Sequence, residues 1–422
     1  MKKIIAYSQH LLLYAAAMAK WVLVSLVVGL VCGLIGSAFH IGVEKAAFFR
    51  ETHPWVIFLF PAAGLLAAAI YQIFRTEGQG TNNILREIQE GKGVSLSLVP
   101  AIFLTTVLTH LAGGSAGREG AALQMGGGIG YNTGKILKLD DRDLRTATMI
   151  GMAAFFSALF GTPLGATVFS LEVISVGLIY HAAFIPCFLA AMTAYGVSLL
   201  LGISPTGFAV SVPAMSILML VRVAFLAVLG GTLSAIFCGI LHVTEHKFES
   251  YIKNKWIRAA AGGLILLGLT LLAGRDYNGA GMGVITAAIE EGSAVPLAFL
   301  WKMIFTAVTL AVGFKGGEVV PSFFVGATFG CVAGPMIGIP AGFSAAVGLI
   351  TVFCGAVNCP LASIFLAIEL FGAQGLLFYA LACGLSYVFS GYAGLYSSQR
   401  ILYDKLKAQF IDVHTNAYHE GG

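Results

Sequence analysis

The chain has 422 residues, of which 58% are hydrophobic and only 10% are charged. Soluble domains carry about a quarter charged residues, so this composition excludes an ordinary water-soluble protein. The 24 lysines and arginines against 20 acidic residues give a formal net charge of +4. That charge is too small and too scattered along the chain to indicate a nucleic acid partner.

Apolar stretches separated by short polar breaks follow one another along the chain. The first set covers about 21–48, 55–74, 96–114, 119–138, 144–160, 163–178 and 180–203, and the second about 213–243, 256–274, 294–313, 317–335, 340–356, 360–372 and 373–390. Several are shorter than the roughly 20 residues that span a bilayer, and many begin or end at glycine or proline. Broken helices at membrane depth must be buried or line a wet cavity, so the pattern predicts a transport pathway.

The two sets of stretches share sequence features that indicate an internal duplication. GREGAALQMGGGIG (117–130) aligns without gaps on GEVVPSFFVGATFG (317–330), and TPLGATVFSLE (162–172) aligns on CPLASIFLAIE (359–369). We therefore expect repeat one at about 20–203, repeat two at about 213–390 and a C-terminal helix at about 394–408. Together they form a single transmembrane domain over 1–422, with no soluble regulatory domain.

Glycines in the aligned segments have a structural and a functional interpretation. For Gly126, Gly130, Gly326 and Gly330, close helix packing through small residues is the favoured interpretation. The glycine-rich turns at 113–121 and 313–321 instead lead into apolar helices, which leaves backbone N–H groups facing whatever lies in front. Such helix ends bind anions, and two inverted repeats would direct both toward one central point.

Glu119 lies at the start of the first of these helices. Its ionised carboxylate would compete with a permeating anion for the same N–H groups, and protonation would release that competition. One acid could therefore act both as a gate and as a proton carrier. The structural alternative is permanent neutralisation of Glu119 by Arg118 or by the helix end.

Three further acids occupy related positions in the aligned segments. Glu318 precedes the position that matches Glu119 by one residue, so a proton-handling role and a simple ion pair with Lys315 are both open. Glu172 and Glu369 stand near the ends of the second pair of aligned helices, where structural hydrogen bonding is favoured.

The GREGA and GEVVP segments, the two PLxxxxxxxE helices and the late GLYSSQR together resemble the CLC family of chloride channels and proton-coupled anion antiporters. The resemblance covers nearly the whole membrane domain. It implies an all-α, polytopic CLC-type inverted repeat whose broken helices meet at the bilayer midplane. It also implies that Glu119 is the external gating glutamate and that the Tyr396 hydroxyl contributes to the central anion site.

Departures from the chloride-type family pattern are equally informative. The chloride-type GSGxP loop is GQGTN (78–82) here, with Gln79 in place of the pore serine, and Val319 replaces the phenylalanine of GxFxP. Val173 follows Glu172 where chloride antiporters often have a second glutamate. These changes resemble the fluoride-exporting branch, in which the glutamate matching Glu318 is implicated in proton coupling, although Gln79 departs even from that branch, which often has methionine.

The resemblance therefore implies an exporter of fluoride in exchange for protons, with no metal or organic cofactor. Gating and proton coupling are assigned to Glu119 and Glu318. The expected anion pathway contains Gln79, Gly80, Thr81, Arg118, Gly120, Val319, Val320 and Tyr396. We expect a homodimer in the bacterial inner membrane, with both termini cytoplasmic because Lys2, Lys3, Arg400, Lys405 and Lys407 flank the apolar region.

Other functions remain open at this point. Chloride or nitrate antiport would follow if Gln79 and Val319 are neutral changes, and a passive anion channel would follow if Glu119 gates without coupling. An intramembrane enzyme that uses these carboxylates is disfavoured. The sequence has no HExxH, GxSxG or paired catalytic aspartate signature, and the acids lie in repeated turns rather than beside a nucleophile.

Overall fold

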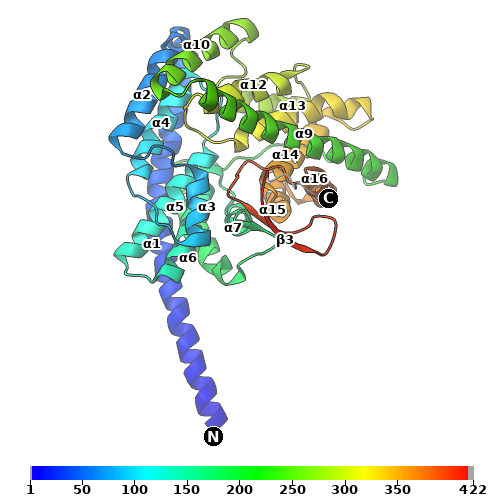
Figure 1. Ribbon diagram of the computed structural model, residues 1–422. Helices are drawn as coiled ribbons and strands as arrows, with labels where there is room; N and C mark the ends of the chain where they lie inside the picture. Colours follow the sequence, from blue (N-terminus) through cyan, green and yellow to red (C-terminus); the bar gives the residue numbers. More distant parts are fainter. Residues whose placement is uncertain (1, 417–422) are drawn as a thin grey trace.

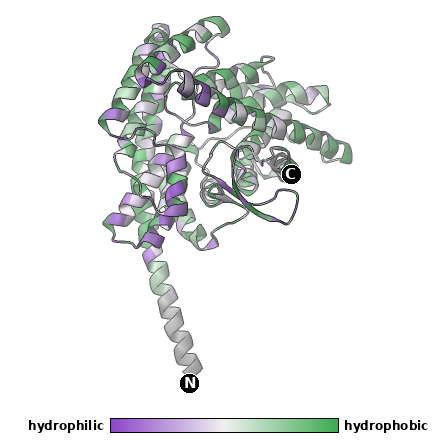
Figure 2. Ribbon diagram, in the orientation of Figure 1, coloured by the Kyte–Doolittle hydropathy of each residue, from purple (hydrophilic) through white to green (hydrophobic). Residues whose placement is uncertain are grey.

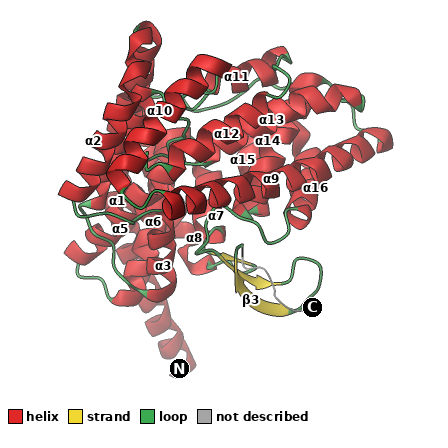
Figure 3. Ribbon diagram, turned by 45° about the horizontal axis from the view of Figure 1, so that its top comes forward, coloured by secondary structure: helices red, strands yellow, loops and turns green. Residues whose placement is uncertain are grey.

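The computed structural model describes residues 2–416 of the protein, with side chains from Tyr14 onward. The described part is mostly helical, with one small sheet at its lower edge in Figure 3. The first half contains α1 (Lys2–Thr52), η1 (Pro54–Leu59), α2 (Phe60–Ile73), α3 (Thr81–Glu90), α4 (Leu98–Ala112), α5 (Glu119–Ile136), α6 (Asp141–Phe160), α7 (Pro163–Glu172), β1 (Ser175–Val176), η2 (His181–Ala183) and α8 (Phe184–Leu200).

The second half begins with a long helix that crosses the molecule (Figure 1). Its elements are α9 (Ile217–Tyr251), α10 (Lys255–Ala273), α11 (Met282–Thr286), the π-helical turn η3 (Ala287–Glu291), α12 (Ala298–Ala311), α13 (Val319–Met336), α14 (Ala341–Val357), α15 (Pro360–Phe371), η4 (Ala373–Gly375), α16 (Leu376–Phe389), β2 (Arg400–Tyr403) and β3 (Phe410–His414).

The helices have the length and composition of membrane spans. In the described residues, six segments are long and apolar enough to cross a bilayer: Tyr14–Thr52, Pro54–Ile73, His181–Leu200, Ile217–Tyr251, Lys255–Ala273 and Val319–Met336. Figure 2 shows apolar residues over most helices, whereas α3 is conspicuously hydrophilic. Shorter apolar helices lie between and after these spans in the chain, as the broken stretches of the sequence predicted. The protein is therefore a multi-pass membrane protein with an all-helical membrane domain.

Equivalent elements recur in the two halves. Helix α5 packs on α6 in the first half, and α13 packs on α14 in the second. Glycines permit both crossings, because a Cβ on Gly126 would lie 2.3 Å from the Gly151 carbonyl oxygen, and a Cβ on Gly326 would lie 2.2 Å from that of Gly348. The packing interpretation of these glycines is confirmed. The division into two repeats stays a prediction, which these matched elements support.

Glu172 and Glu369 hold the two halves together by capping each other's helices. The Glu172 carboxylate, at the end of α7, accepts hydrogen bonds from the N–H groups of Leu361 (3.2 Å) and Ala362 (2.7 Å) at the start of α15. The Glu369 carboxylate, at the end of α15, accepts from Leu164 (2.9 Å) and Gly165 (2.7 Å) at the start of α7. A negative charge at a helix N-terminus satisfies otherwise unpaired N–H groups. The predicted structural role of both acids is confirmed.

The predicted C-terminal helix at 394–408 is wrong. Residues Arg400–Tyr403 form strand β2, which pairs in parallel with β1 and in antiparallel with β3. Two features favour the extended conformation. The Ile401 side chain is fully buried, and the Gln399 side chain donates hydrogen bonds to the carbonyl oxygens of Val173 (3.0 Å) and Val357 (2.8 Å). Local sequence alone does not reveal these tertiary partners. The last residues of the chain, 417–422, lie outside the described residues.

Removal of one reciprocal cap tests the connection between the halves. Glu172→Ala leaves the N–H groups of Leu361 and Ala362 without their acceptor, so we expect a loss of about 1–3 kcal/mol in the free energy of unfolding. Chemical unfolding in mixed detergent micelles measures this change. Glu291→Ala, which removes an exposed carboxylate, is the matched control. Equal stability of the two variants would contradict the capping role.

Candidate anion and proton site

Two matched turns meet at the centre of the site. Gly113 and Gly313 adopt nearly the same left-handed conformation, with φ of 100° and 102°, and each begins the turn that leads to α5 or α13. Gly117 and Gly317 then form an isolated antiparallel bridge, in which each N–H donates to the carbonyl oxygen of the other at 2.7 Å. The starts of α5 and α13 are therefore fixed side by side.

The close approach of the two turns requires glycine. A Cβ on Gly317 would lie 2.3 Å from the backbone nitrogen of Gly120, and a Cβ on Gly316 would lie 2.4 Å from the Ala116 side chain. Real Cβ contacts are never so short, so any side chain here would push the turns apart. The glycines of the sequence pattern thus serve backbone contact between the halves.

The Glu119 side chain is fully buried and reaches across to the other turn. One carboxylate oxygen lies 2.2 Å from the position that a Cβ on Gly117, in its own turn, would occupy, and the Val320 backbone nitrogen of the other turn lies 3.2 Å from that same position. The carboxylate faces the backbone N–H groups of Arg118, Glu119 and Val320, which belong to the starts of both helices. Neither oxygen completes a regular hydrogen bond within the described residues. The carboxylate therefore occupies the position in which two helix ends would hold an anion, without being locked there.

Glu119 lines a cavity of about 560 Å³, which we call the Glu119 cavity. Its wall includes Glu44, Arg118, His110 and Val320. The Arg118 guanidinium lies 3.9 Å from both the Glu119 and the Glu44 carboxylates, so its charge is shared between them. The predicted alternative of full neutralisation by Arg118 is not favoured, because 3.9 Å exceeds normal hydrogen-bond length.

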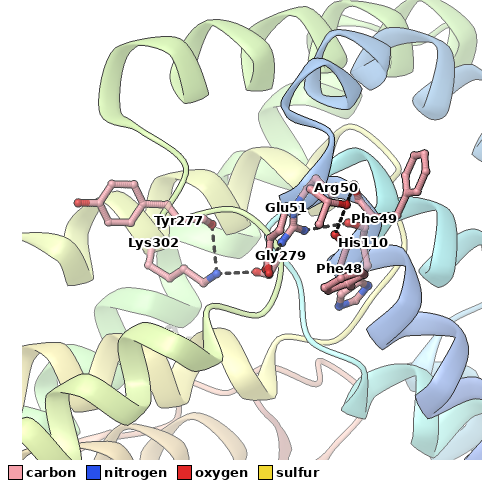
Figure 4. A network of polar contacts seen from close by, with 9 residues as sticks. Phe48, Phe49, Arg50, Glu51, His110, Tyr277, Gly279 and Lys302 are labelled. Carbon is pink, nitrogen blue, oxygen red and sulfur yellow. Dashed lines mark hydrogen bonds and ion pairs between the residues drawn. The ribbon is translucent and has the colours of Figure 1, made fainter.

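Two basic side chains organise the loop beside the Glu119 cavity (Figure 4). Arg50 donates to the His110 carbonyl oxygen at 2.8 Å and lies 3.3 Å from the Glu51 carboxylate. Lys302, fully buried on α12, donates to the carbonyl oxygens of Tyr277 (3.1 Å) and Gly279 (2.7 Å). Buried cations normally need such partners, and here backbone oxygens supply them, from the end of α4 for Arg50 and from the loop between α10 and α11 for Lys302.

Glu318 occupies a separate cavity. This Glu318 cavity has a volume of about 180 Å³ and shares no lining residue with the Glu119 cavity. One Glu318 carboxylate oxygen lies 3.3 Å from the position of a Cβ on Gly120, at the start of α5. Glu119 therefore reaches toward the turn of the second half, and Glu318 toward the turn of the first.

The alternative ion pair between Lys315 and Glu318 is wrong. No ion pair joins the two side chains in the part of the chain that the structure describes. The Lys315 ammonium instead lies over the Tyr71 ring, 4.8 Å from its centroid, where a cation is attracted to the aromatic face. Glu318 is therefore left available for other chemistry.

The GQGTN loop supplies polar groups to the Glu318 cavity. Gln79, Gly80 and Thr81 all line it, immediately before and within the first turn of α3. The Asn83 side chain caps that turn by accepting from the Gly80 N–H at 3.0 Å. The Thr81 hydroxyl accepts from the Gln124 side chain of α5 at 3.1 Å, which ties the loop to the helix that Glu119 begins.

Tyr396 enters the same cavity from the C-terminal segment. Its hydroxyl is buried and has no hydrogen-bond partner within the described residues. Its backbone is held from behind, because the Thr415 hydroxyl donates to the Tyr396 carbonyl oxygen at 2.6 Å. A buried, unpaired hydroxyl directed by a fixed backbone is suited to donate to a bound anion.

The predicted site residues thus fall into three sets: those that line the Glu119 cavity, those that line the Glu318 cavity and those that line neither. Arg118, Glu119 and Val320 line the Glu119 cavity. Gln79, Gly80, Thr81, Glu318 and Tyr396 line the Glu318 cavity. Gly120 and Val319 line neither cavity, since Gly120 contacts the opposite turn and Val319 is fully buried in the core.

Sequence reasoning missed several charged residues around both cavities. Glu44 and Arg50 lie near the end of α1, and His242 and Glu245 lie near the end of α9. Lys302 was also missed, although a lysine within an apolar stretch is itself a signal of function or pairing. The others are separated from the repeated turns by many residues, so only the fold brings them to the site.

Comparison with known proteins identifies the family. A sequence profile described as "Voltage gated chloride channel" (Voltage_CLC) matches residues 63–391. A chloride/fluoride channel protein of Pseudomonas syringae pv. tomato is 37% identical over 403 residues, which is 92% of this chain and 88% of the relative. The chain belongs to the CLC family.

Other CLC proteins are similar over most of their length. The crystal structure of a CLC-type fluoride/proton antiporter superposes with a TM-score of 0.88 at 33% identity, covering 90% of this chain and 98% of that protein. The H(+)/Cl(-) exchange transporter ClcA of Yersinia pestis is 26% identical over 378 residues, covering 82% of this chain and 78% of the relative. The CLC fold predicted from the repeated motifs is confirmed.

The contact between the two turns can be tested in this CLC protein. Gly317→Ala places a methyl group against the Gly120 backbone, so we expect a loss of roughly 1–3 kcal/mol in the free energy of unfolding from forced displacement. Gly283→Ala is the control, because a Cβ there meets no atom within 4 Å. Thermal unfolding of purified protein in detergent compares the two. Equal midpoints would show that the turns tolerate separation.

Proposed function

We propose that this protein is a CLC-type antiporter that exports fluoride in exchange for protons. The observation that carries the proposal is the crossed pair of acids. Glu119 reaches toward the second turn and Glu318 toward the first, and each lines its own cavity beside the Gly117–Gly317 bridge. Two carboxylates so arranged can carry a proton between cavities that an anion must also cross.

The anion would be held by backbone N–H groups rather than by cationic side chains. When Glu119 takes up a proton, its carboxyl group loses its attraction for the starts of α5 and α13, and an anion can replace it there. The unpaired Tyr396 hydroxyl and the polar groups of Gln79 and Thr81 would compensate the anion for lost water at the Glu318 cavity. Fluoride binds its water strongly, so it needs several such donors.

Exchange of the anion for protons follows if the two ions bind alternately, the proton to Glu119 and the anion to the helix starts that the protonated Glu119 vacates. An ionised Glu119 blocks the helix ends, and a protonated Glu119 admits the anion. Glu318 then receives the proton on the side of its own cavity. Proton entry therefore drives anion exit, and neither ion moves freely without the other.

Two observations support fluoride rather than chloride as the transported anion. The chloride/fluoride channel protein and the fluoride/proton antiporter are 37% and 33% identical to this chain, and the H(+)/Cl(-) exchanger ClcA is 26% identical. Within the chain, Gln79 replaces the pore serine of the chloride-type pattern. An amide offers two N–H donors where a hydroxyl offers one, which suits a small anion.

Assembly and location are part of the same proposal. We expect a homodimer in the bacterial inner membrane with one pathway in each subunit and both termini in the cytoplasm. Export of fluoride requires the Glu119 cavity to open to the outside and the Glu318 cavity to the cytoplasm. Chloride/proton exchange is the second candidate, supported by the likeness to ClcA over 82% of the chain.

Ion flux from reconstituted liposomes tests the proposal directly. Fluoride and chloride electrodes would record efflux with and without an imposed pH gradient. We expect fluoride efflux far above chloride efflux, driven uphill by the pH gradient. Chloride efflux equal to or above fluoride would instead assign the protein to chloride exchange, and efflux unaffected by the pH gradient would indicate a passive channel.

Substitution of Glu119 tests the gate. Glu119→Gln cannot ionise, so we expect proton movement to stop while fluoride moves passively down its gradient. A pH electrode and a fluoride electrode on the same liposomes measure both fluxes. Fully coupled exchange by this variant would exclude Glu119 as the gate.

Glu318 is tested in the same assay. Glu318→Gln should lose proton coupling, because its side chain can neither take up nor release a proton. Lys315→Met changes the charge of the same turn but keeps both carboxylates, so we expect it to retain the ratio of proton to fluoride flux. Retained coupling in Glu318→Gln would leave Glu318 with a structural role only.

A further inference from the structure

Glu245, near the end of α9, shares the Glu318 cavity with Glu318. We propose that Glu245 is the group that passes protons between Glu318 and the aqueous phase. The inference rests on the proposed fluoride/proton exchange and extends it by one residue, which belongs to neither repeated turn.

The burial of the acids forms a graded series. Glu119 is fully buried, Glu318 is half-buried and Glu245 is exposed, although Glu245 and Glu318 line the same small cavity. A proton on Glu318 needs an exit through that cavity, because Glu318 is enclosed on its other side by the start of α5. Glu245 is the more exposed of the two acids that line this cavity.

The charges around Glu245 favour exchange rather than a fixed ion pair. Lys315 lines the same cavity as Glu245 and Glu318 but forms an ion pair with neither in the described residues. Its positive charge can therefore attract the negative charge on whichever of the two acids is ionised, without being held by one of them. Arg258 and Glu249, which lie outside the cavity lining, pair with each other at 3.5 Å.

The histidine of the cavity is restrained. His242, one turn before Glu245 on α9, has its Nε2 atom 2.9 Å from the Gly394 carbonyl oxygen and 3.1 Å from the Asn416 side chain. These contacts fix the ring against the C-terminal segment. An exposed carboxylate without such restraints is better suited to repeated proton transfer, and Glu245 is the exposed carboxylate of the cavity.

The proposed step is balanced. The Glu318 carboxyl group gives its proton to the Glu245 carboxylate, directly or through one water molecule, and Glu318 becomes ionised. Glu245 then releases the proton to water and returns to its starting charge. No other reactant is needed.

Glu245→Gln tests the inference in the reconstituted protein. We expect coupled proton and fluoride fluxes to fall several-fold together, with their ratio unchanged, because the exit is slowed and the coupling is left intact. Glu318→Gln should instead lose proton flux altogether. Glu245→Asp should restore most of the rate, since it keeps the carboxylate.

Glu249→Gln is the matched control. It removes the same charge one helical turn further along α9, outside the cavity, and we expect fluxes like those of the unmutated protein. Addition of a small buffer that does not itself cross the bilayer should raise the rate of Glu245→Gln, because buffer can replace a missing surface carboxylate. A structural defect would not respond to buffer.

The outcomes separate the two proposals. Unmutated rates in Glu245→Gln, or a decrease that Glu249→Gln reproduces, would overturn the role of Glu245 and leave the exchange intact. Absence of proton movement in the unmutated protein would overturn the exchange itself and this inference with it.

Discussion

Backbone contact between Gly117 and Gly317 is the constraint on which the site depends. Two hydrogen bonds of 2.7 Å join the turns, and no side chain fits between them. This contact brings two helix starts together, so their N–H groups converge on one small volume. Glycines also let α5 cross α6, and α13 cross α14, at close distance. Together with the reciprocal caps of Glu172 and Glu369, these crossings hold the two halves in the relative position that the contact requires.

Backbone groups, rather than opposite charges, stabilise most of the buried charges of this membrane protein. Glu172 and Glu369 accept from N–H groups, Lys302 donates to carbonyl oxygens, and Glu119 faces N–H groups at two helix starts. Tight ion pairs would need both partners to move together. A carboxylate held by dipoles can leave when protonated, and an anion can take its place. In the proposed exchange, the same backbone dipoles that make these charges tolerable in the membrane would let Glu119 give way to an anion.

The C-terminal segment links the Glu318 cavity to the rest of the fold. Its strand β2 pairs with β1, its Gln399 side chain bonds to both halves, and Thr415 holds the backbone of Tyr396. The small sheet thus fixes the direction of one phenol. An anion site with few donors tolerates little displacement, so this rigid support is as important to the site as the donors themselves.

Sequence alone determined the membrane class, the broken helices, the family and the two repeated turns, because each is encoded in local composition or in motifs such as GREGA and GEVVP. Glu119 and Glu318 were predicted as candidate site residues for the same reason, since an acid in a glycine-rich apolar turn is conspicuous. Tertiary structure alone decided that Lys315 lies over Tyr71, that residues 400–403 form a strand, and that Glu245 shares a cavity with Glu318. These features depend on contacts between residues far apart in the chain, whose energies no local pattern records.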